Sequence, residues 1–408
     1  MKRATAIGHL DADCFYVSAE RVRYPKLVGV PVGVIGNQGA CVIAKSYEMK
    51  EAGVRTGMAI WDAQKLCPDG VYVKRDFRWY EALSRMMLDV VKEFSPRVEY
   101  YSIDEFFFEA APPLGVDLDA YAIRIRDRIS NRIGVPVTVG IARTKTLAKL
   151  ISDTAKPFGA RAVTDRASEE TLLDHLSVRE IAGIAGRRQR RLIPWGIKTC
   201  LDLARADRAL VREILTASGE ALWWELRGDP VLPVRPDRVP HKMLSRGGSF
   251  GEATDRPSVL WAWLVRNVER LIEELRYHRV LPGRIAVWVG YRDGQGAEGG
   301  ARLEVPSDRF DVLLDAFRPC LRLAWRPRVA ANRMHLLATD LRNRRGAQLG
   351  LFDDRSGRPE AVDRVKAGIN ERHNRFALRS AATLPLAAIY RDRANEYDIC
   401  DIRNKACF

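Results

Sequence analysis

The seven cysteines of this 408-residue chain include no C-x-x-C pair, and no histidine lies near the loosely clustered Cys400 and Cys407. The sequence therefore lacks the spacing of a zinc knuckle or a disulfide framework, and scattered thiols are typical of a reducing compartment. It also has no apolar run as long as a membrane span, and its first residues lead into a short strand without the apolar core of a signal peptide. These absences predict a cytoplasmic protein.

Acidic residues are outnumbered, with 52 Asp and Glu against 67 Lys and Arg, a formal net charge of +15 and a pI near 9.7. Such an excess favours a polyanionic partner. Nucleic acid is preferred to a membrane surface because the sequence shows neither a basic amphipathic anchor nor a lipidation signal. The length predicts about two to four domains.

Two adjacent carboxylates, Asp104 and Glu105, stand within the apolar stretch Tyr101–Glu109, which predicts a hairpin of buried strands. Burying ionised carboxylates is costly unless a cation or strong hydrogen bonds compensate. A divalent metal is the simplest compensation, since hard oxygen ligands suit Mg²⁺, and a solvated turn is the alternative. Asp11 and Asp13, two residues apart at the end of another predicted strand, would share a face.

The first part of the chain alternates strands and helices. This pattern predicts an α+β layer with antiparallel strands and helices on one face. Apolar spacing predicts helices over 14–24, 47–52, 59–67, 77–94, 118–133 and 144–155, and strands over 31–35, 40–44 and 135–142.

A basic turn, Gly183–Arg191, lies in a region from about residue 168 to 227 that predicts short helices only. A small-residue turn that opens a helix presents backbone N–H groups to an anion, and the arginines add charge. A contact with the DNA backbone is favoured over a solvated helix of a small bundle.

Prolines crowd the stretch from Asp229 to Pro240 and predict a semi-rigid linker. Beyond it, helices over 259–277 and 310–323 and strands over 284–291, 301–305 and 334–341, with one more before the first helix, predict a second α+β layer. The polar tail contains Gln348–Asp353, which either offers anchors to a groove on a partner or packs onto the body.

These pieces together resemble a Y-family, translesion-type DNA polymerase over nearly the whole chain. Lys50 and the tail are closer to the UmuC-like branch than to the DinB-like one. The motifs that carry the resemblance, in order, are L-D-A-D-C-F-Y-V-S-A-E (10–20), V-I-A-K-S-Y-E-M-K (42–50), S-I-D-E (102–105), V-G-I-A-R-T-K-T-L-A-K (139–149), A-K-P-F-G (155–159), S-R-G-G-S-F-G (245–251) and Q-L-G-L-F (348–352).

The resemblance implies an α+β, multidomain right hand. Residues 1–11 and 77–165 would form a ferredoxin-like palm, 12–76 small fingers, 166–229 a helical thumb with a helix–hairpin–helix-like turn, and 242–342 an α+β little finger. Residues 230–241 would be the linker. The tail, 343–408, would bind a sliding clamp through Gln348, Leu351 and Phe352.

By the same resemblance, Asp11, Asp104 and Glu105 are the catalytic carboxylates and, with the Ala12 carbonyl, the ligands of two Mg²⁺ ions, which Mn²⁺ can replace. One ion would lower the pKa of the primer 3′-hydroxyl, and the other would hold the triphosphate and the leaving pyrophosphate. Glu105 either binds the ion that activates the primer or mainly shapes that site. Asp13 matches a position that is usually not a ligand.

Tyr16 matches the steric gate, a ring against the deoxyribose where a 2′-hydroxyl would clash, with an ordinary core tyrosine as the alternative. Tyr47, Lys50 and Lys156 match the triphosphate contacts, and Phe15 belongs to the same nucleotide site. Lysine at position 50, where arginine is common, keeps the charge but loses bidentate geometry.

The implied DNA contacts are Gly183, Gly186, Arg187 and Arg188 of the thumb and Arg246 of the little finger. Two departures from the family pattern stand out. Ala185 replaces the usual second glycine of the thumb turn, which puts close approach to a phosphate in doubt. Gly247-Gly248 lengthens the usual Ser-Arg-Ser-Phe-Gly run.

The leading hypothesis is a damage-tolerant DNA polymerase, a monomer acting on primer–template DNA and dNTPs with a sliding clamp and accessory damage-response proteins, in the cytoplasm at the nucleoid. Expression under damage stress is what the resemblance suggests. A catalytically weak scaffold bound to DNA and clamp is the alternative, although all three carboxylates are present. A nucleotidyl cyclase is a third hypothesis. It would need no basic helical domain, no proline linker and no second α+β layer, and the presence of all three argues against it.

Overall fold

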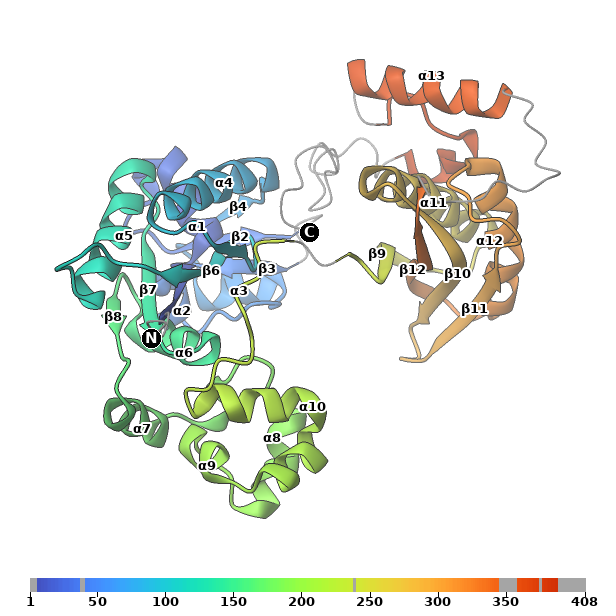
Figure 1. Ribbon diagram of the computed structural model, residues 1–408. Helices are drawn as coiled ribbons and strands as arrows, with labels where there is room; N and C mark the ends of the chain where they lie inside the picture. The colour runs from blue at the N-terminus through green and yellow to red at the C-terminus, as the bar shows by residue number, and fades with distance from the viewer. Residues whose placement is uncertain (1–5, 37–40, 238–239, 345–357, 374–375, 388–408) are drawn as a thin grey trace. The chain divides into compact units, whose positions relative to one another are not determined.

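The chain folds as two units, residues 1–238 and residues 239–405, each with its own core (Figure 1). The structure is a computed structural model, and it describes all residues except 1–5, 37–40, 238–239, 345–357, 374–375 and 388–408. No helix in the described part of the chain is long and apolar enough to cross a membrane.

The first unit is built on a five-stranded sheet of order β5-β6-β1-β7-β8. Neighbouring strands are antiparallel except β7 and β8. The strands are β1 (Ala6–Ala12), β5 (Val98–Tyr100), β6 (Glu105–Ala110), β7 (Val137–Ala142) and β8 (Ala160–Ala162). With helices α4 (Phe77–Phe94) and α5 (Leu118–Ile133), the order β1-α4-β5-β6-α5-β7 is a βαββαβ, ferredoxin-like arrangement. The predicted α+β class is confirmed.

The two faces of this sheet pack against different helices. Phe106 lies on the face of α4 and α5, because it contacts Tyr100, whose hydroxyl bonds Ser84 of α4. On the opposite face, a Cβ at Gly140 would come within 2.4 Å of the Ala148 carbonyl oxygen in α6 (Lys145–Ala155). The prediction that the helices cover one face is therefore wrong, since glycine at 140 lets α6 lie directly on the other.

Between β1 and α4 the chain inserts a smaller layer with a three-stranded sheet of order β3-β2-β4. The parallel edge strand β4 was not predicted, and it is short and half-exposed. The inserted elements are α1 (Phe15–Arg23), β2 (Val32–Ile35), β3 (Val42–Lys45), α2 (Tyr47–Glu51), α3 (Ile60–Leu66) and β4 (Val71–Lys74).

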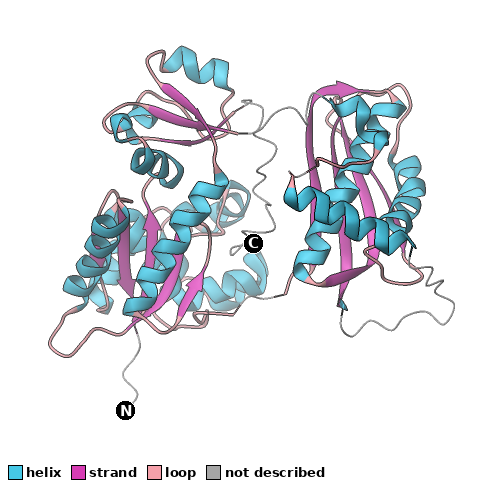
Figure 2. Cartoon of the chain, turned by 90° about the horizontal axis from the view of Figure 1, so that it is seen from above, coloured by secondary structure: helices cyan, strands magenta, loops and turns pink. Residues whose placement is uncertain are grey.

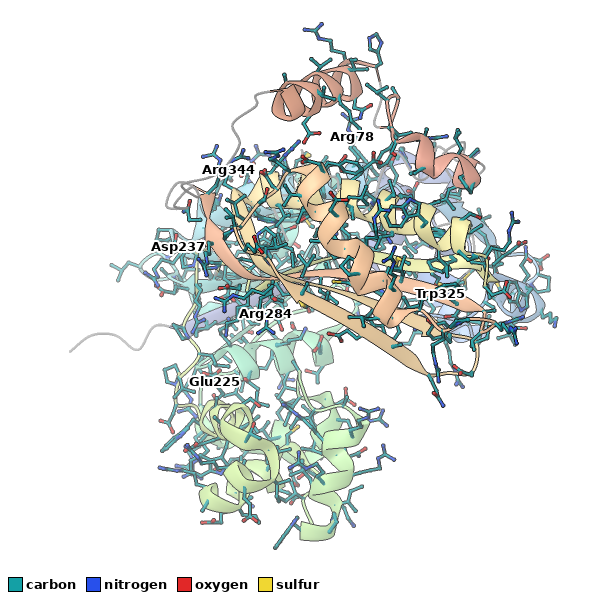
Figure 3. The ribbon with its side chains drawn as sticks, turned by 90° about the vertical axis from the view of Figure 1, so that its right-hand side faces the viewer. Arg78, Glu225, Asp237, Arg284, Trp325 and Arg344 are labelled. Carbon is teal, nitrogen blue, oxygen red and sulfur yellow. The ribbon has the colours of Figure 1, made fainter. Side chains whose placement is uncertain are left out.

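Helices follow β8, as predicted: α7 (Arg166–His175), α8 (Gly186–Leu192), α9 (Cys200–Arg205) and α10 (Arg208–Leu226). The first three are short, and the 19-residue α10 is kinked at Thr216, which has φ +67°. Their core is continuous with that of α6. The buried Glu225 of α10, labelled in Figure 3, accepts a hydrogen bond from the Thr146 amide at 3.1 Å in the first turn of α6. The helical region and the sheet are therefore joined through a carboxylate at a helix N-terminus.

The proline-rich segment expected to be a linker is attached to the first unit over residues 231–235. Val234 is buried and packs on Ile7 and Phe107. Its carbonyl accepts a hydrogen bond from Arg97, and the Arg235 amide donates to Glu99 at 2.8 Å.

The second unit is a four-stranded antiparallel sheet of order β11-β10-β12-β9 with two long helices packed over it (Figure 2). Its elements are β9 (Met243–Thr254), α11 (Pro257–His278), β10 (Val280–Tyr291), β11 (Gly296–Arg302), α12 (Phe310–Ala324) and β12 (Ala331–Asn343). The strand predicted over 301–305 lies instead at β11. Glycines obscure its pattern, and a Cβ at Gly299 would meet the Cys320 carbonyl of α12 at 2.1 Å. The polar tail contains α13 (Arg358–Arg372) and a 3₁₀ helix (Ala381–Leu386), for which no helix was predicted.

Candidate active site

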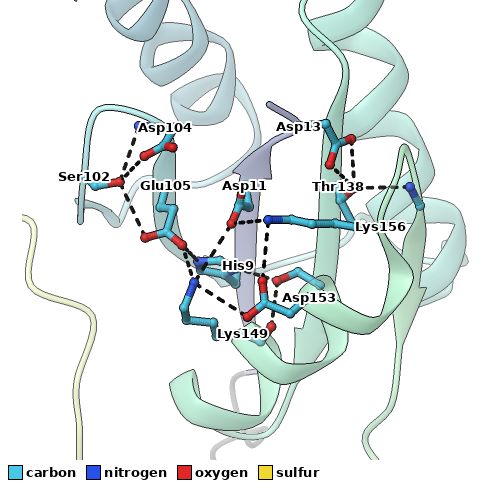
Figure 4. Close-up of polar contacts among 12 residues, drawn as sticks. His9, Asp11, Asp13, Ser102, Asp104, Glu105, Thr138, Lys149, Asp153 and Lys156 are labelled. Atoms are coloured by element: carbon cyan, nitrogen blue, oxygen red, sulfur yellow. Dashed lines mark hydrogen bonds and ion pairs between the residues drawn. The ribbon is translucent and has the colours of Figure 1, made fainter. Parts of the chain in front are cut away.

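Pairing of β1 with β6 brings the predicted carboxylates together at one end of the sheet. Asp11 lies opposite Glu105 in the antiparallel register, and the Ala12 amide donates to the Asp104 carbonyl at 3.0 Å. Adjacent residues of a strand point to opposite faces. The chain bends over residues 102–104 before β6 begins, so the rule of alternating faces does not apply to Asp104 and does not separate it from Glu105. Ser102 Oγ donates to Asp104 and lies 3.5 Å from Glu105 Oε2 (Figure 4).

Two lysines reach these carboxylates, Lys149 from α6 and Lys156 from the residue directly after it. Lys156 Nζ lies 2.7 Å from Asp11 Oδ2, and Lys149 Nζ pairs with Glu105 and lies 4.0 Å from Asp11 Oδ2. Asp153 lies between them, 3.8 Å from Lys149 and 3.5 Å from Lys156. The lysines therefore compensate part of the buried negative charge.

The pKa values of the carboxylates indicate that negative charge in this site is only partly compensated. Burial raises the pKa of Asp11 to about 7, against the lowering effect of Lys156. Burial also raises the pKa of Asp104, with Glu105 adding to the effect. For Lys149 and Lys156 burial acts to lower the pKa, but their carboxylate partners outweigh it and the pKa of each is raised. The site thus holds more buried carboxylate than its two ammonium groups neutralise.

This donor set fits a divalent cation, because it consists of hard oxygen ligands whose ionised forms need further positive charge. Ala12, whose carbonyl is the fourth predicted ligand, follows Asp11 at the end of β1. Across the described ranges, no three His, Cys, Asp or Glu side chains already stand together as a metal site. In this structure the carboxylates of Asp11 and Glu105 are paired with Lys156 and Lys149.

Asp13 stands apart from this group. β1 ends at Ala12, so the strand parity that would have placed Asp13 beside Asp11 no longer applies. Its carboxylate contacts Thr138 and the Phe158 amide instead.

The Tyr16 ring sits in an aromatic cluster at the start of α1. It stacks on Tyr80, with centroids 4.6 Å apart and planes 15° apart, and meets Phe77 edge-on. Phe15 is 3% exposed and packs beside both rings, with centroids 5.8 Å from Tyr16 and 6.3 Å from Tyr80. Its side chain is a core residue of the cluster, and its contact with a nucleotide stays a prediction.

Tyr47 and Lys50 both lie on the short helix α2, which Ser46 caps by accepting from the Met49 amide. Tyr47 is half-buried, with its hydroxyl 3.5 Å from Asp13 Oδ1, and Lys50 is exposed. Burial raises the pKa of Tyr47 further above its ordinary value, so it is present as a phenol.

The thumb turn has the conformation that its glycine requires, with Gly183 at φ +93°. Ala185 is extended (φ −87°, ψ 177°) and caps α8, so alanine there causes no backbone strain. Arg187 is exposed, whereas Arg188 donates to the Gly183 carbonyl and to Ser218. Arg188 thus also fixes the turn itself.

Arg246 does not lie on an exposed face. It pairs with Leu336 in the sheet register, on the core side, and its guanidinium forms an ion pair with the buried Glu274 of α11. At 8% exposure its side chain is buried within its own unit, and the DNA contact at Arg246 stays a prediction. The neighbouring Gly247 is required by packing, because its Cβ would lie 2.0 Å from the Met334 carbonyl.

Gln348, Leu351 and Phe352 lie outside the described residues.

Four residues of the carboxylate site were not predicted: His9, Ser102, Lys149 and Asp153. His9 is fully buried, bonds Ser152 through Nδ1 at 2.7 Å and faces Glu105 at 3.7 Å. Burial lowers the pKa of His9 well below its usual value, which keeps the ring neutral. Lys149 ends the V-G-I-A-R-T-K-T-L-A-K motif (139–149), and that place in a motif was the signal that could have marked it.

The first unit has the layout of a right-hand polymerase. Its ferredoxin-like sheet carries acidic residues near the end of β1 and at the start of β6, and a small helical domain is joined to it. The impB/mucB/samB family model matches residues 10–153, and the model of the C-terminal domain of that family matches residues 241–351. The chain belongs to this family, the Y-family DNA polymerases. The cyclase alternative is thereby excluded.

Curated relatives span most of the chain. MucB of Salmonella typhimurium is 30% identical, with 89% of this chain and 90% of that protein covered. DNA polymerase IV 2 of Mesorhizobium japonicum is 31% identical, covering 94% and 97%. UmuC of Salmonella typhimurium is 30% identical, covering 85% and 86%. Both branches match at similar identity, so the UmuC-like assignment stays a prediction.

Solved structures agree in fold. The "Y-family DNA polymerase chimera Dbh-Dpo4(243-245)-Dbh" has a TM-score of 0.71 at 23% identity, covering 83% of this chain and 99% of that one. The "Insertion ternary complex of Dbh DNA polymerase" has a TM-score of 0.55 at 22% identity, covering 83% and 99%.

Proposed function

We propose that the chain is a template-directed DNA polymerase of the translesion type, which adds dNTPs to a primer 3′-hydroxyl opposite damaged template bases. The observation that carries the proposal is the cluster of the buried Asp11 and the partly buried Asp104 and Glu105 at the end of two paired strands, within a fold of the Y-family. A scaffold that binds DNA without chemistry would not need to keep three carboxylates together at a partly desolvated site.

Asp11, Asp104, Glu105 and the Ala12 carbonyl would hold two Mg²⁺ ions, or Mn²⁺ in their place. When bound, these ions supply charge for the in-line transfer of a nucleotidyl group. The neighbouring side chains bind and orient the nucleotide. Lys156, Tyr47 and Lys50 hold the triphosphate, and Tyr16 limits the space beside the sugar.

Primer–template DNA is the macromolecular substrate, held in part by Gly183, Gly186, Arg187 and Arg188 of the thumb region. By this proposal residues 1–11 and 77–165 act as palm, 12–76 as fingers, 166–229 as thumb and 242–342 as little finger. The enzyme acts as a monomer in the cytoplasm, and the segment Gln348–Phe352 binds a sliding clamp.

Primer extension tests the proposal. Purified protein, Mg²⁺ and four dNTPs should lengthen a labelled primer on an undamaged template, and also past at least one lesion of a defined panel. Failure to extend any primer, with DNA binding intact, would favour the scaffold. Extension that stops before every lesion would leave a polymerase but remove the translesion role.

A further inference from the structure

The buried carboxylate of Asp13 holds two separate segments of the first unit (Figure 4). Its Oδ2 accepts a hydrogen bond from the Phe158 amide at 2.8 Å, and both oxygens lie 3.1 Å from Thr138 Oγ1. The Tyr47 hydroxyl lies 3.5 Å from Oδ1. Asp13 is only 2% exposed, so its acceptor capacity is directed at these neighbours.

The first of these segments is the turn after α6 that carries Lys156. Thr138 Oγ1 also accepts from the Gly159 amide at 3.3 Å, so Asp13 and Thr138 together bind two consecutive amides of the turn. Phe158 has φ +51°, a left-handed conformation that is uncommon for a residue other than glycine. The hydrogen bond to Asp13 stabilises this turn and with it the direction of Lys156.

The second segment is α2, which begins at Tyr47 and carries Lys50. Tyr47 and Lys156 are far apart in the sequence, yet both approach the same carboxylate. A buried charge is weak evidence for stability, because well-packed apolar residues do at least as well. What distinguishes the Asp13 carboxylate is that it contacts both the turn that carries Lys156 and the helix that carries Tyr47.

We infer that Asp13 is a positioning residue, which aligns Lys156 and Tyr47 for the triphosphate without binding metal or nucleotide itself. This inference rests on the proposed function. It gives Asp13 a role distinct from that of Asp11, although only Ala12 separates them.

The test is a dNTP titration in single-turnover primer extension with Asp13→Ala, Lys156→Met and the double variant. Each single change should raise the apparent Kd for dNTP about ten- to a hundredfold, as expected for the loss of a charged contact. The Kd for primer–template DNA should change by less than about twofold. Residues that act through one another are not additive, so the double variant should bind dNTP no more weakly than the poorer single variant.

Multiplied effects in the double variant, or unchanged dNTP affinity in Asp13→Ala, would overturn the inference and leave the polymerase proposal standing. A wild-type protein that neither extends a primer nor binds Mg–dNTP in calorimetry would overturn both.

Thr138 provides a second route should Asp13→Ala not fold. Thr138→Val removes the hydroxyl at nearly constant volume and should weaken dNTP binding in the same way, whereas Thr138→Ser should restore it. Equal dNTP affinity in the two variants would contradict the inference. Asp165→Ala, which removes the cap of α7 and touches neither Asp13 nor Thr138, is the control for a general loss of thermal stability.

Discussion

Lys156 Nζ lies 2.7 Å from Asp11 Oδ2, so the lysine expected at the triphosphate is paired with the first of the expected metal ligands. In this structure Lys156 therefore supplies at Asp11 the positive charge that a divalent cation would otherwise supply.

The Asp11→Asn variant should gain stability over the wild type as the pH rises, in the presence of EDTA. Burial raises the pKa of Asp11 from 3.8 to about 7. A carboxyl group with a raised folded-state pKa contributes its full stability below its unfolded pKa and loses it as the pH rises through the folded value. At 1.36 kcal/mol per pKa unit, the difference between wild type and variant amounts to about 4 kcal/mol at most.

Urea unfolding at pH 5 and pH 7.5 covers about 2 of the roughly 3 pH units over which this stability is lost, so about 3 kcal/mol of the difference should appear. Asp165→Asn is the control, because the hydrogen bond from the Ser168 amide lowers the pKa of Asp165. The contribution of Asp165 is then fully present at both pH values, and its gap to the wild type should not change between them. A gap between Asp11→Asn and wild type that is the same at both pH values would show that Asp11 ionises normally.

Asp104→Asn should reduce primer extension to background while primer–template affinity changes little. The substitution keeps the size of a side chain that Ser102 bonds but removes the charge that a cation needs. Extension assays and DNA-binding titrations check the two halves of the prediction. Asp119→Asn, a comparable change on α5, should extend normally, and retained extension by Asp104→Asn would remove the metal role.

Tyr16→Ala should raise the ratio of ribonucleotide to deoxyribonucleotide incorporation roughly ten- to a hundredfold, since rejection of one added hydroxyl by steric fit has about that range. Competing rNTP and dNTP reactions measure the ratio. Tyr80→Phe is the matched control, because it keeps the stacked ring and loses only the hydrogen bond to Glu20. A ratio unchanged in Tyr16→Ala would identify Tyr16 as an ordinary core residue.

Gly140→Ala should destabilise the protein by about 1–3 kcal/mol and impair extension. The new Cβ would meet the Ala148 carbonyl at 2.4 Å and the Ser152 amide at 2.5 Å, which displaces α6 and the lysines it carries. Thermal melting and extension assays check both effects. Gly368→Ala, which adds a Cβ in open space on α13, should have neither effect.

Deletion of residues 348–352 should abolish stimulation by a sliding clamp and leave clamp-free extension intact. The comparison requires extension assays with and without loaded clamp. Stimulation that survives the deletion would place the docking peptide elsewhere.

Periodicity predicted the elements with strong amphipathic patterns and failed where glycine or short length removed the pattern. The helices 77–94 and 118–133 were predicted with the bounds they have, because their buried residues recur at helical spacing. β4 is a short edge strand with no buried face, and three glycines obscure the pattern of β11. Long-range pairing of these strands depends on contacts that no local window contains.

The carboxylate cluster was predictable because its members lie in recognisable motifs, whereas its counter-charges depend on how α6 crosses the sheet. Arg246 shows what a motif leaves open. The resemblance implied a DNA contact for it, and in the structure the strand register directs its side chain inward to Glu274. The sequence shows that a strand carries a basic residue, but the pairing register of the strand decides on which face of the sheet its side chain lies.

Glu225 is also the point at which three parts of the first unit meet. Its side chain accepts from the amides of Thr146, Val231 and Leu232, and its carbonyl accepts from Thr144 Oγ1. The start of α6, the last turn of α10 and the segment at residues 231–232 therefore all depend on one carboxylate and its own carbonyl. A change at Glu225 would act on all three segments together, and through α6 on Lys149, which pairs with Glu105.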